Sequence, residues 1–214
     1  MPVSLIVLAA GLGTRMNSDL PKVLHHVAAA PLLHHALTAG RALDPARVVV
    51  VAGHEAEAVT RSALAFDESV QVVVQEPQLG TAHAVTTAAP LLAEAAGDAI
   101  VLYGDTPFIR PETLQAMLEA RAQHAVVILG FQARDAGRYG RLIVNGDRLE
   151  KIVEYKDATE SERAVTLCNS GVVCADAKTL FDLVAQVGND NAAGEYYLTD
   201  IVEIARGRAS RRGW

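Results

Sequence analysis

A glycine-rich stretch near the N-terminus carries the residues best suited to bind phosphate. LAAGLGTRMNSDLPK, residues 8–22, ends an apolar run in two glycines and then adds an arginine and a lysine. Gly11 and Gly13 let backbone N–H groups approach an anion closely. Arg15 offers a planar fork of donors to phosphate oxygens, and Lys22, which follows a proline, offers a compact charge on a loop. These residue types at this spacing predict a phosphate-binding loop, against the alternative of a simple strand-to-helix turn.

Two familiar glycine motifs do not fit this stretch. The dinucleotide-binding pattern G-x-G-x-x-G would need a glycine where the sequence has Met16. The pattern G-x-x-x-x-G-K-[ST] of Walker-type ATPases is also missing. The loop therefore belongs to neither of these nucleotide-binding classes.

An aspartate follows the fourth apolar run of the chain. Asp105 comes directly after residues 98–104 and before Thr106 and Pro107, which end the run. A carboxylate at the end of a buried strand suits Mg²⁺, which takes one or two carboxylates together with phosphate oxygens of a substrate. The alternative is an aspartate that only caps a turn. The position after Tyr103 and Gly104 favours the metal.

The elements that must position these residues alternate along the first half of the chain. Four short β-branched runs read as strands buried on both faces, at 4–10, 47–53, 70–75 and 98–104. Helical patterns lie between them, at 31–43, 55–65 and 80–95. This alternation predicts βαβ units and an α/β fold with a parallel sheet. Ligands of such sheets bind beyond the carboxyl ends of the strands, which is where the glycine-rich stretch begins.

The second half has a different texture. A helix at 111–123, begun by a proline, precedes further strands at 125–132, 140–144, 148–155 and 166–175. The turn NGD at 145–147 predicts a β-hairpin, and helices return at 176–187 and 198–206. We expect one mixed sheet in a single domain, residues 1–207, with a nucleotide-binding half at 1–110 and a hairpin-bearing half at 111–207. The basic tail, 208–214, is expected to be disordered.

Composition limits the classes of function. Half of the 214 residues are hydrophobic and 21% are charged, as in soluble globular proteins, and the net charge of −6 argues against a nucleic-acid binder. No run is long enough for a membrane helix and no signal peptide is apparent, so we expect a cytoplasmic protein without membrane partners. Cys168 and Cys174 would lie about 20 Å apart on one strand, which predicts reduced core residues. The seven histidines lack the spacing of a zinc site.

Several motifs in order along the whole chain resemble those of sugar-1-phosphate nucleotidyltransferases. Among these, the chain is most similar to the uridylyltransferase domain of the bacterial bifunctional GlmU proteins. Beside LAAGLGTRM and LPKVL, the motifs are QLGTAHA at 78–84, YGDTP at 103–107, YGR at 139–141, IVEYKDAT at 152–159, CNSGV at 168–172 and GEYYLTD at 194–200. The resemblance implies the nucleotide-diphospho-sugar transferase fold, a Rossmann-like, mixed and mostly parallel sheet flanked by helices with a hairpin-bearing sugar-binding half. It also implies Mg²⁺-dependent formation of UDP-N-acetylglucosamine and pyrophosphate from UTP and N-acetylglucosamine 1-phosphate.

The resemblance also implies roles for individual residues. The catalytic set is Arg15, Lys22 and Asp105, and Asp105 is the metal ligand. The nucleotide-binding set is Leu8, Ala9, Ala10, Gly11, Gln75, Gly80 and Thr81. The sugar-binding set is Tyr103, Gly104, Gly140, Glu154 and Asn169.

Side-chain chemistry is compatible with several of these roles, although without the resemblance the same residues indicate a solvated glutamine, a strand-edge glutamate, a turn glycine and a strand-end asparagine. The Gln75 amide both donates and accepts, which suits a uracil edge, and Gly80 and Thr81 begin a helix whose N–H groups are expected to be free for a ligand. Glu154 suits sugar hydroxyls as an acceptor, whereas Asn169 suits donors or acceptors and Gly140 permits close approach of the backbone.

Two parts of the resembled proteins lie beyond the last residue of this sequence. One is an asparagine that gives Mg²⁺ a second protein ligand, and the other is a C-terminal β-helix with acetyltransferase activity and trimer contacts. We therefore expect weak activity, no acetyltransferase function and no implied oligomer. The alternatives are a transferase for another sugar 1-phosphate or nucleoside triphosphate, and a nucleotide-sugar binding module that no longer catalyses.

Overall fold

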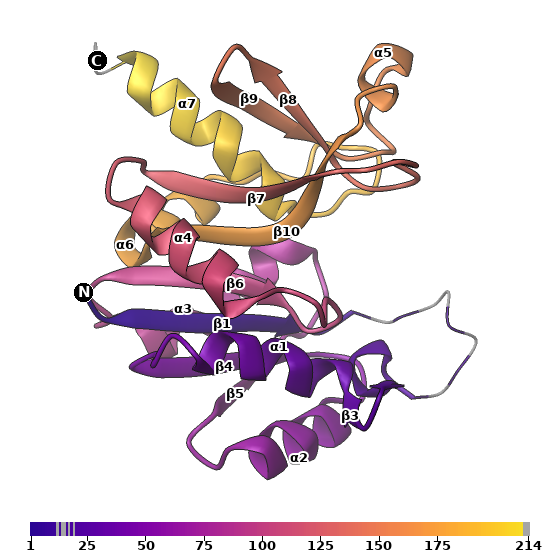
Figure 1. The fold of residues 1–214 in the computed structure, drawn as a ribbon, viewed down its shortest axis with the longest axis vertical. Coiled ribbons are helices and arrows are strands. Elements are labelled where there is room, and N and C mark those ends of the chain that lie inside the picture. The colour runs from indigo at the N-terminus through magenta and orange to yellow at the C-terminus, as the bar shows by residue number, and fades with distance from the viewer. Residues whose placement is uncertain (12, 14–15, 17, 19, 212–214) are drawn as a thin grey trace.

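One eight-stranded sheet with helices on both faces organises the chain (Figure 1). The computed structural model describes every residue except 12, 14, 15, 17, 19 and 212–214. The strand order is β5-β4-β1-β6-β10-β8-β9, and β7 pairs with β10. Within the described residues, no helix is both long and apolar enough to cross a bilayer.

The first half of the sheet is parallel, as predicted. The central strand β1 (Val3–Ala9) pairs on one side with β4 (Arg47–Ala52) and on the other with β6 (Asp98–Tyr103), and β5 (Gln71–Val74) follows β4. Every residue of β1 is buried because helices cover both faces, which explains why its sequence is continuously apolar. The crossover helices are α1 (Leu32–Arg41), α2 (Ala56–Phe66) and α3 (Thr81–Leu92). A short 3₁₀ turn at Lys22–Leu24 and a small two-stranded sheet, β2 (His26–Val27) and β3 (Ala30–Pro31), precede α1.

The second half adds antiparallel strands to the same sheet. After α4 (Pro111–Arg121) come β7 (Val126–Gln132), β8 (Arg141–Asn145), β9 (Arg148–Val153), the short α5 (Glu160–Arg163) and β10 (Leu167–Asp176). The predicted hairpin is confirmed, since Asn145 pairs with Arg148 across a two-residue turn in which Gly146 has a φ of 60°. Helix α6 (Ala177–Val184), a 3₁₀ turn at Leu198–Asp200 and helix α7 (Ile201–Arg211) complete the chain.

The expected end of the last helix was wrong. Helix α7 continues to Arg211, so residues 208–211 are helical and do not belong to a disordered tail. The remaining tail, 212–214, lies outside the described residues.

Two apolar cores lie on opposite faces of the sheet. One packs α3, α6 and α7 against the sheet through residues such as Val85, Leu180 and Ile201, and the other packs α1, α2 and α4 against it through Leu37 and Leu114. Cys168 and Cys174 share β10 and are buried and free, as predicted.

Strand β10 changes partner halfway along its length. Residues Val173–Asp176 pair with β6, whereas Cys168 pairs with Arg141 of β8, and the register against β7 shifts between Asn169 and Val173. Gly171, with a φ of 90°, lies in this irregular segment. The ring of Tyr103, the last residue of β6, packs against Gly171 in this segment.

One glycine outside the site holds the strands β1 and β6 in register. Gly97 has a φ of 90°, and a Cβ added there would lie 2.1 Å from the carbonyl oxygen of Pro2. The Asp98 N–H donates to that same oxygen at 3.1 Å. A side chain would therefore push apart the chains that begin β1 and β6.

We expect Gly97→Ala to lower the free energy of unfolding by about 2 kcal/mol or more, because the substitution adds a backbone clash to an unfavourable positive φ. Urea denaturation followed by circular dichroism measures the change. Gly188→Ala is the matched control, because nothing lies within 4 Å of a Cβ added there. Equal midpoints for Gly97→Ala and the control would contradict the expectation.

Candidate active site

The end of the glycine-rich stretch meets the end of β6 through an ion pair. The Lys22 ammonium donates to the Asp105 carboxylate, with 2.5 Å between Nζ and Oδ2. The two side chains are 36% and 26% exposed, so both remain open to a ligand. Gly13, with a φ of 59°, packs beneath Lys22, where a Cβ would lie 2.9 Å from the Lys22 Cβ. Arg15, the other predicted cation, lies outside the described residues.

Backbone carbonyl groups at the end of β1 already accept hydrogen bonds from within the protein. The carbonyl oxygen of Leu8 accepts from the Gly104 N–H at 2.9 Å, and that of Ala10 accepts from the Gln78 amide at 2.8 Å. Leu8, Ala9 and Ala10 are buried, whereas Gly11 is exposed with open space beside it. Of these four predicted nucleotide-binding residues, Gly11 is the exposed one.

Gln75 is held more tightly than its sequence position indicated. The side chain is only 4% exposed, and its amide nitrogen donates to the carbonyl oxygen of Gly80 at 2.9 Å and to Nδ1 of His83 at 3.0 Å. Because the Gly80 carbonyl can only accept, the nitrogen must be the atom that faces it. With the His83 ring proton on Nε2, both N–H groups are used, and the side chain offers only its oxygen to a ligand. How Gln75 would pair with a base stays a prediction, which this arrangement narrows to its acceptor oxygen.

The helix start at Gly80 and Thr81 is confirmed, but its N–H groups are not all free. Gly80 caps α3 with a φ of 117°, and a Cβ there would lie 2.6 Å from the carbonyl oxygen of Tyr196. That oxygen accepts from the N–H of Ala82 at 2.8 Å, so this amide is not free for a ligand, contrary to expectation. The Thr81 hydroxyl accepts from the N–H of Leu198 at 2.8 Å.

Tyr103 joins the two halves of the site. Burial, with a smaller contribution from the Glu154 charge, raises the pKa of Tyr103 above its ordinary range, and a hydrogen bond from Thr81 opposes this shift. The phenol is therefore a neutral group near pH 7. A Cβ at Gly171 would lie 2.6 Å from the Tyr103 ring, so only glycine leaves room for the ring. Tyr103 is the last residue of β6 and Gly104 follows it, so the strand ends one residue earlier than the predicted end at 104.

The three predicted sugar-binding residues of the second half lie together. The Gly140 carbonyl accepts from the Asn169 N–H at 2.9 Å, and a Cβ added to Gly140 would lie 3.3 Å from Oε1 of Glu154. The Asn169 side-chain oxygen accepts from the Gly171 N–H at 3.0 Å, which leaves its amide nitrogen as a donor. The Thr199 hydroxyl donates to Oε1 of Glu154 at 3.2 Å.

Negative charge surrounds Glu154. Burial raises the pKa of its carboxyl group, the hydrogen bond from Thr199 lowers it, and the nearby charges of Asp200, Asp157 and Glu195 raise it further. Burial also raises the pKa of Asp200 to about 6, with added repulsion from Glu203 and Asp157. The part of the site around Glu154 is thus acidic, whereas the charges of Lys22 and Asp105 are paired with each other.

Sequence reasoning missed four residues that hold the site together. Gln78, His83 and Thr199 make the contacts described above, and their partners are distant enough that no local pattern reveals them. The fourth is Arg141, which is 2% exposed and donates to the carbonyl oxygens of Ala136, Gly137, Tyr139 and Arg163. The position of Arg141, directly after a glycine and at the start of a strand, was the one feature of the sequence that could have indicated its role.

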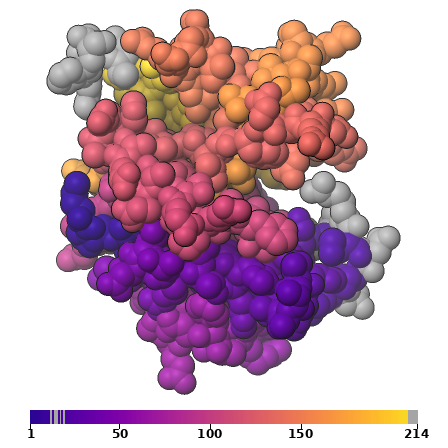
Figure 2. All heavy atoms as spheres, in the orientation of Figure 1, coloured from indigo at the N-terminus to yellow at the C-terminus, as the bar shows by residue number. Residues whose placement is uncertain are grey.

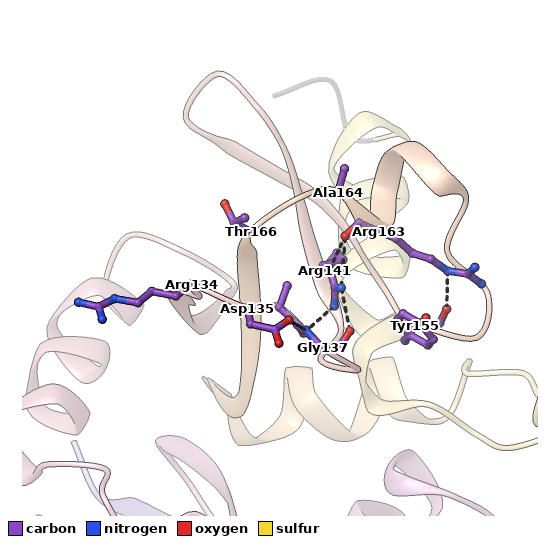
Figure 3. Close-up of a pocket in the computed structure, with 9 residues that line it drawn as sticks. Arg134, Asp135, Gly137, Arg141, Tyr155, Arg163, Ala164 and Thr166 are labelled. Carbon is purple, nitrogen blue, oxygen red and sulfur yellow. Dashed lines mark hydrogen bonds between the residues drawn. The ribbon is translucent and has the colours of Figure 1, made fainter.

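Arg141 fixes the loop that leads into Gly140. Figure 3 shows its side chain between the segment of Gly137 and that of Arg163, at the base of an open pocket of about 500 Å³. Its five bonds use all five guanidinium N–H groups, so none is left for a ligand in this pocket. The residue therefore acts as a structural clamp behind the site.

We expect Arg141→Lys to lower the free energy of unfolding by about 2–4 kcal/mol, because an ammonium group offers only three donors to four carbonyl groups and lacks the planar fork. Urea denaturation measures this. Arg138→Lys is the control, since Arg138 is an exposed arginine on the same loop. A loss no larger than that of the control would rule out the clamp.

The raised pKa of Asp200 predicts a pH dependence of stability. The folded value of about 6 exceeds the ordinary value of 3.8, so the folded state binds this proton more tightly than the unfolded state. The contribution of Asp200 to the free energy of unfolding therefore falls as the pH rises from about 4 to about 6. Relative to the unsubstituted chain, Asp200→Asn should gain stability over this range and keep the gain above it.

Urea titrations at pH 4 and pH 7.5 test this expectation. Asp190→Asn changes an exposed loop aspartate and serves as the control. The difference in free energy of unfolding between Asp200→Asn and the unsubstituted chain should widen from pH 4 to pH 7.5. If it does not, the pKa of Asp200 is not raised in the folded state.

Comparison with known proteins agrees with this geometry. Over 211 residues the chain is 70% identical to the protein named "Bifunctional protein GlmU" from Cereibacter sphaeroides, and over 206 residues it is 62% identical to the protein of the same name from Ruegeria pomeroyi. These matches cover 99% and 96% of this chain but 46% of each relative, so the chain spans about half the length of the curated relatives it matches. They confirm the resemblance to the GlmU uridylyltransferase domain.

A solved structure confirms the fold. UDP-glucose pyrophosphorylase complexed with UDP-glucose aligns with a TM-score of 0.78 over 97% of this chain and 88% of that chain, at 17% sequence identity. At this identity the likeness shows the nucleotide-diphospho-sugar transferase fold alone. Residues 5–167 match the family described as "MobA-like NTP transferase domain". This match covers most of the sequence and every strand of the parallel half, and the chain belongs to that family.

Proposed function

We propose that the chain transfers a uridylyl group from UTP to N-acetylglucosamine 1-phosphate and releases pyrophosphate. The observation that carries the proposal is the contact between Lys22, in the segment that follows β1, and Asp105, just beyond the end of the neighbouring parallel strand β6. Open α/β sheets bind nucleotides at this edge. The identity to the two GlmU relatives supports uridylyl transfer as the reaction.

The two ends of the substrate pair would occupy the two halves of the site. The base would lie against Gly11 and the oxygen of Gln75, near the helix start at Gly80 and Thr81. The sugar would lie against Tyr103, Gly104, Gly140, Glu154 and Asn169. In the space-filling view, the first half of the chain (indigo to magenta) and the second (pink to yellow) pack directly against each other, consistent with one domain of two functional halves, residues 1–110 and 111–207 (Figure 2).

The residues present fit a magnesium ion held jointly with the substrate. Mg²⁺ usually keeps several waters and binds through one or two carboxylates and substrate phosphates. Asp105 offers one partly exposed carboxylate, and no group of three or more histidine, cysteine or acidic residues suited to a metal occurs among the described residues. Asp105 would hold the ion, which would supply positive charge to the triphosphate when bound.

The chemistry needs charge neutralisation more than proton transfer. An oxygen of the sugar phosphate would form the new bond to the α-phosphorus of UTP while the bond to the β-phosphate oxygen breaks. The attacking oxygen is already anionic near pH 7, so no general base is required. Lys22 would stabilise the charge that develops on the phosphates, and Arg15 would assist by the resemblance described above. The protein would contribute chiefly by holding the two phosphates in line.

Substrate selectivity distinguishes this proposal from a transferase for another sugar 1-phosphate or nucleoside triphosphate. Pyrophosphate release should be measured with each of the four nucleoside triphosphates and with several sugar 1-phosphates, with and without Mg²⁺. The proposal expects the highest kcat/KM for UTP with N-acetylglucosamine 1-phosphate. Higher turnover with another pair would support a different transferase, and tight UDP-sugar binding without turnover would support a binding module.

Removal of either partner of the ion pair tests the mechanism. We expect Lys22→Ala and Asp105→Ala each to lower kcat by at least about 100-fold, the scale seen when an electrostatic contact to the transition state is lost. Lys178→Ala is the control because Lys178 is exposed on α6, and it should leave kcat unchanged. Near-normal rates for both site variants would remove these residues from the mechanism.

A further inference from the structure

A histidine with no part in the proposed chemistry holds the side chain expected to face the base. His83 lies in the first turn of α3, and its Nδ1 is 3.0 Å from the Gln75 amide nitrogen. We infer that His83 is a positioning residue that sets base selectivity by forcing Gln75 to act only as an acceptor. The inference rests on the proposed function, in which Gln75 faces the nucleotide base.

Two acceptors restrain the Gln75 amide. Its nitrogen faces the Gly80 carbonyl at 2.9 Å as well as His83. Rotation of the amide by half a turn would place the side-chain oxygen against both acceptors and leave unpaired groups in a site where Gln75 is only 4% exposed. His83 serves as an acceptor only when its ring proton is on Nε2, so the contact also defines the tautomer.

An acceptor at this place distinguishes pyrimidines by their edge. Uracil carries a hydrogen on N3 and can donate it to the Gln75 oxygen, whereas N3 of cytosine carries a lone pair that this oxygen repels. If the amide could turn, its N–H groups would face the base and cytosine would be tolerated. With only the Gly80 carbonyl left to oppose the turn, a protein without the His83 acceptor should discriminate less well between UTP and CTP.

Two substitutions of His83 distinguish the effect of losing the hydrogen-bond acceptor from the effect of changing the side-chain size. His83→Leu fills similar space without an acceptor. His83→Asn can place an oxygen at the same number of bonds from the backbone as Nδ1. The UTP-to-CTP ratio of kcat/KM should fall by about 3- to 10-fold in His83→Leu, the effect of one neutral hydrogen bond, and should remain within about twofold in His83→Asn. His124→Leu, at an exposed histidine, should leave the ratio unchanged.

Binding provides the same test without turnover. Calorimetry with UMP and CMP should show the affinity ratio falling in His83→Leu and recovering in His83→Asn. An unchanged ratio in His83→Leu, or an equal loss in both variants, would overturn the inference. If the unsubstituted protein releases no pyrophosphate with any triphosphate, the proposed function fails while the binding ratios still decide the role of His83.

Nitrogen-15 NMR of the imidazole tests the contact itself. At pH 8 the His83 ring should carry its proton on Nε2, with Nδ1 showing the shift of an unprotonated, hydrogen-bonded acceptor. A proton on Nδ1 would contradict the inference directly, because that nitrogen could not then accept from Gln75.

Discussion

The parallel pairing of β1 with β6 is the constraint on which the site depends. Leu8 lies opposite Tyr103 in this pair, and the Gly104 N–H continues the ladder by donating to the Leu8 carbonyl at 2.9 Å. Both strands therefore end at the same edge of the sheet, and the residues that follow them must share the space beyond it. Asp105 lies just beyond β6, and the segment after β1 brings Lys22, 83 residues away in the sequence, into contact with it.

The antiparallel second half brings its own residues to the same edge. Strand β10 runs against β6, so the segment before its paired residues lies beside the end of β6. The shift in register between Asn169 and Val173 turns this segment out of the regular ladder, and Gly171 leaves room for the Tyr103 ring. One irregularity in a strand thus accommodates the Tyr103 ring, and Asn169 lies at its start.

The sequence predicted the architecture well because strand and helix periodicity are local. The four parallel strands, the crossover helices and the hairpin at 145–147 all follow from patterns within a few residues. The short α5 could also have been predicted, since Thr159 and Glu162 form a capping box whose spacing is visible in the sequence. What could not be predicted are the partners of polar groups, such as Gln75 with His83 or Arg141 with the carbonyl groups of its loop. Those depend on how distant segments pack.

Contacts within the protein decide which donors and acceptors of the site remain available to a ligand. The Gln75 amide nitrogen contacts Gly80 and His83 within the protein, and the Asn169 side-chain oxygen accepts from the Gly171 N–H. These hydrogen bonds within the protein fix the orientation of each side-chain amide before a ligand binds, which preorganises the site. The charges divide in the same way, because Lys22 stands alongside one carboxylate while Glu154 lies among several. A phosphate group is repelled more strongly by the acidic groups around Glu154 than by the Lys22–Asp105 pair, so the field of the site favours binding with the phosphate toward Lys22.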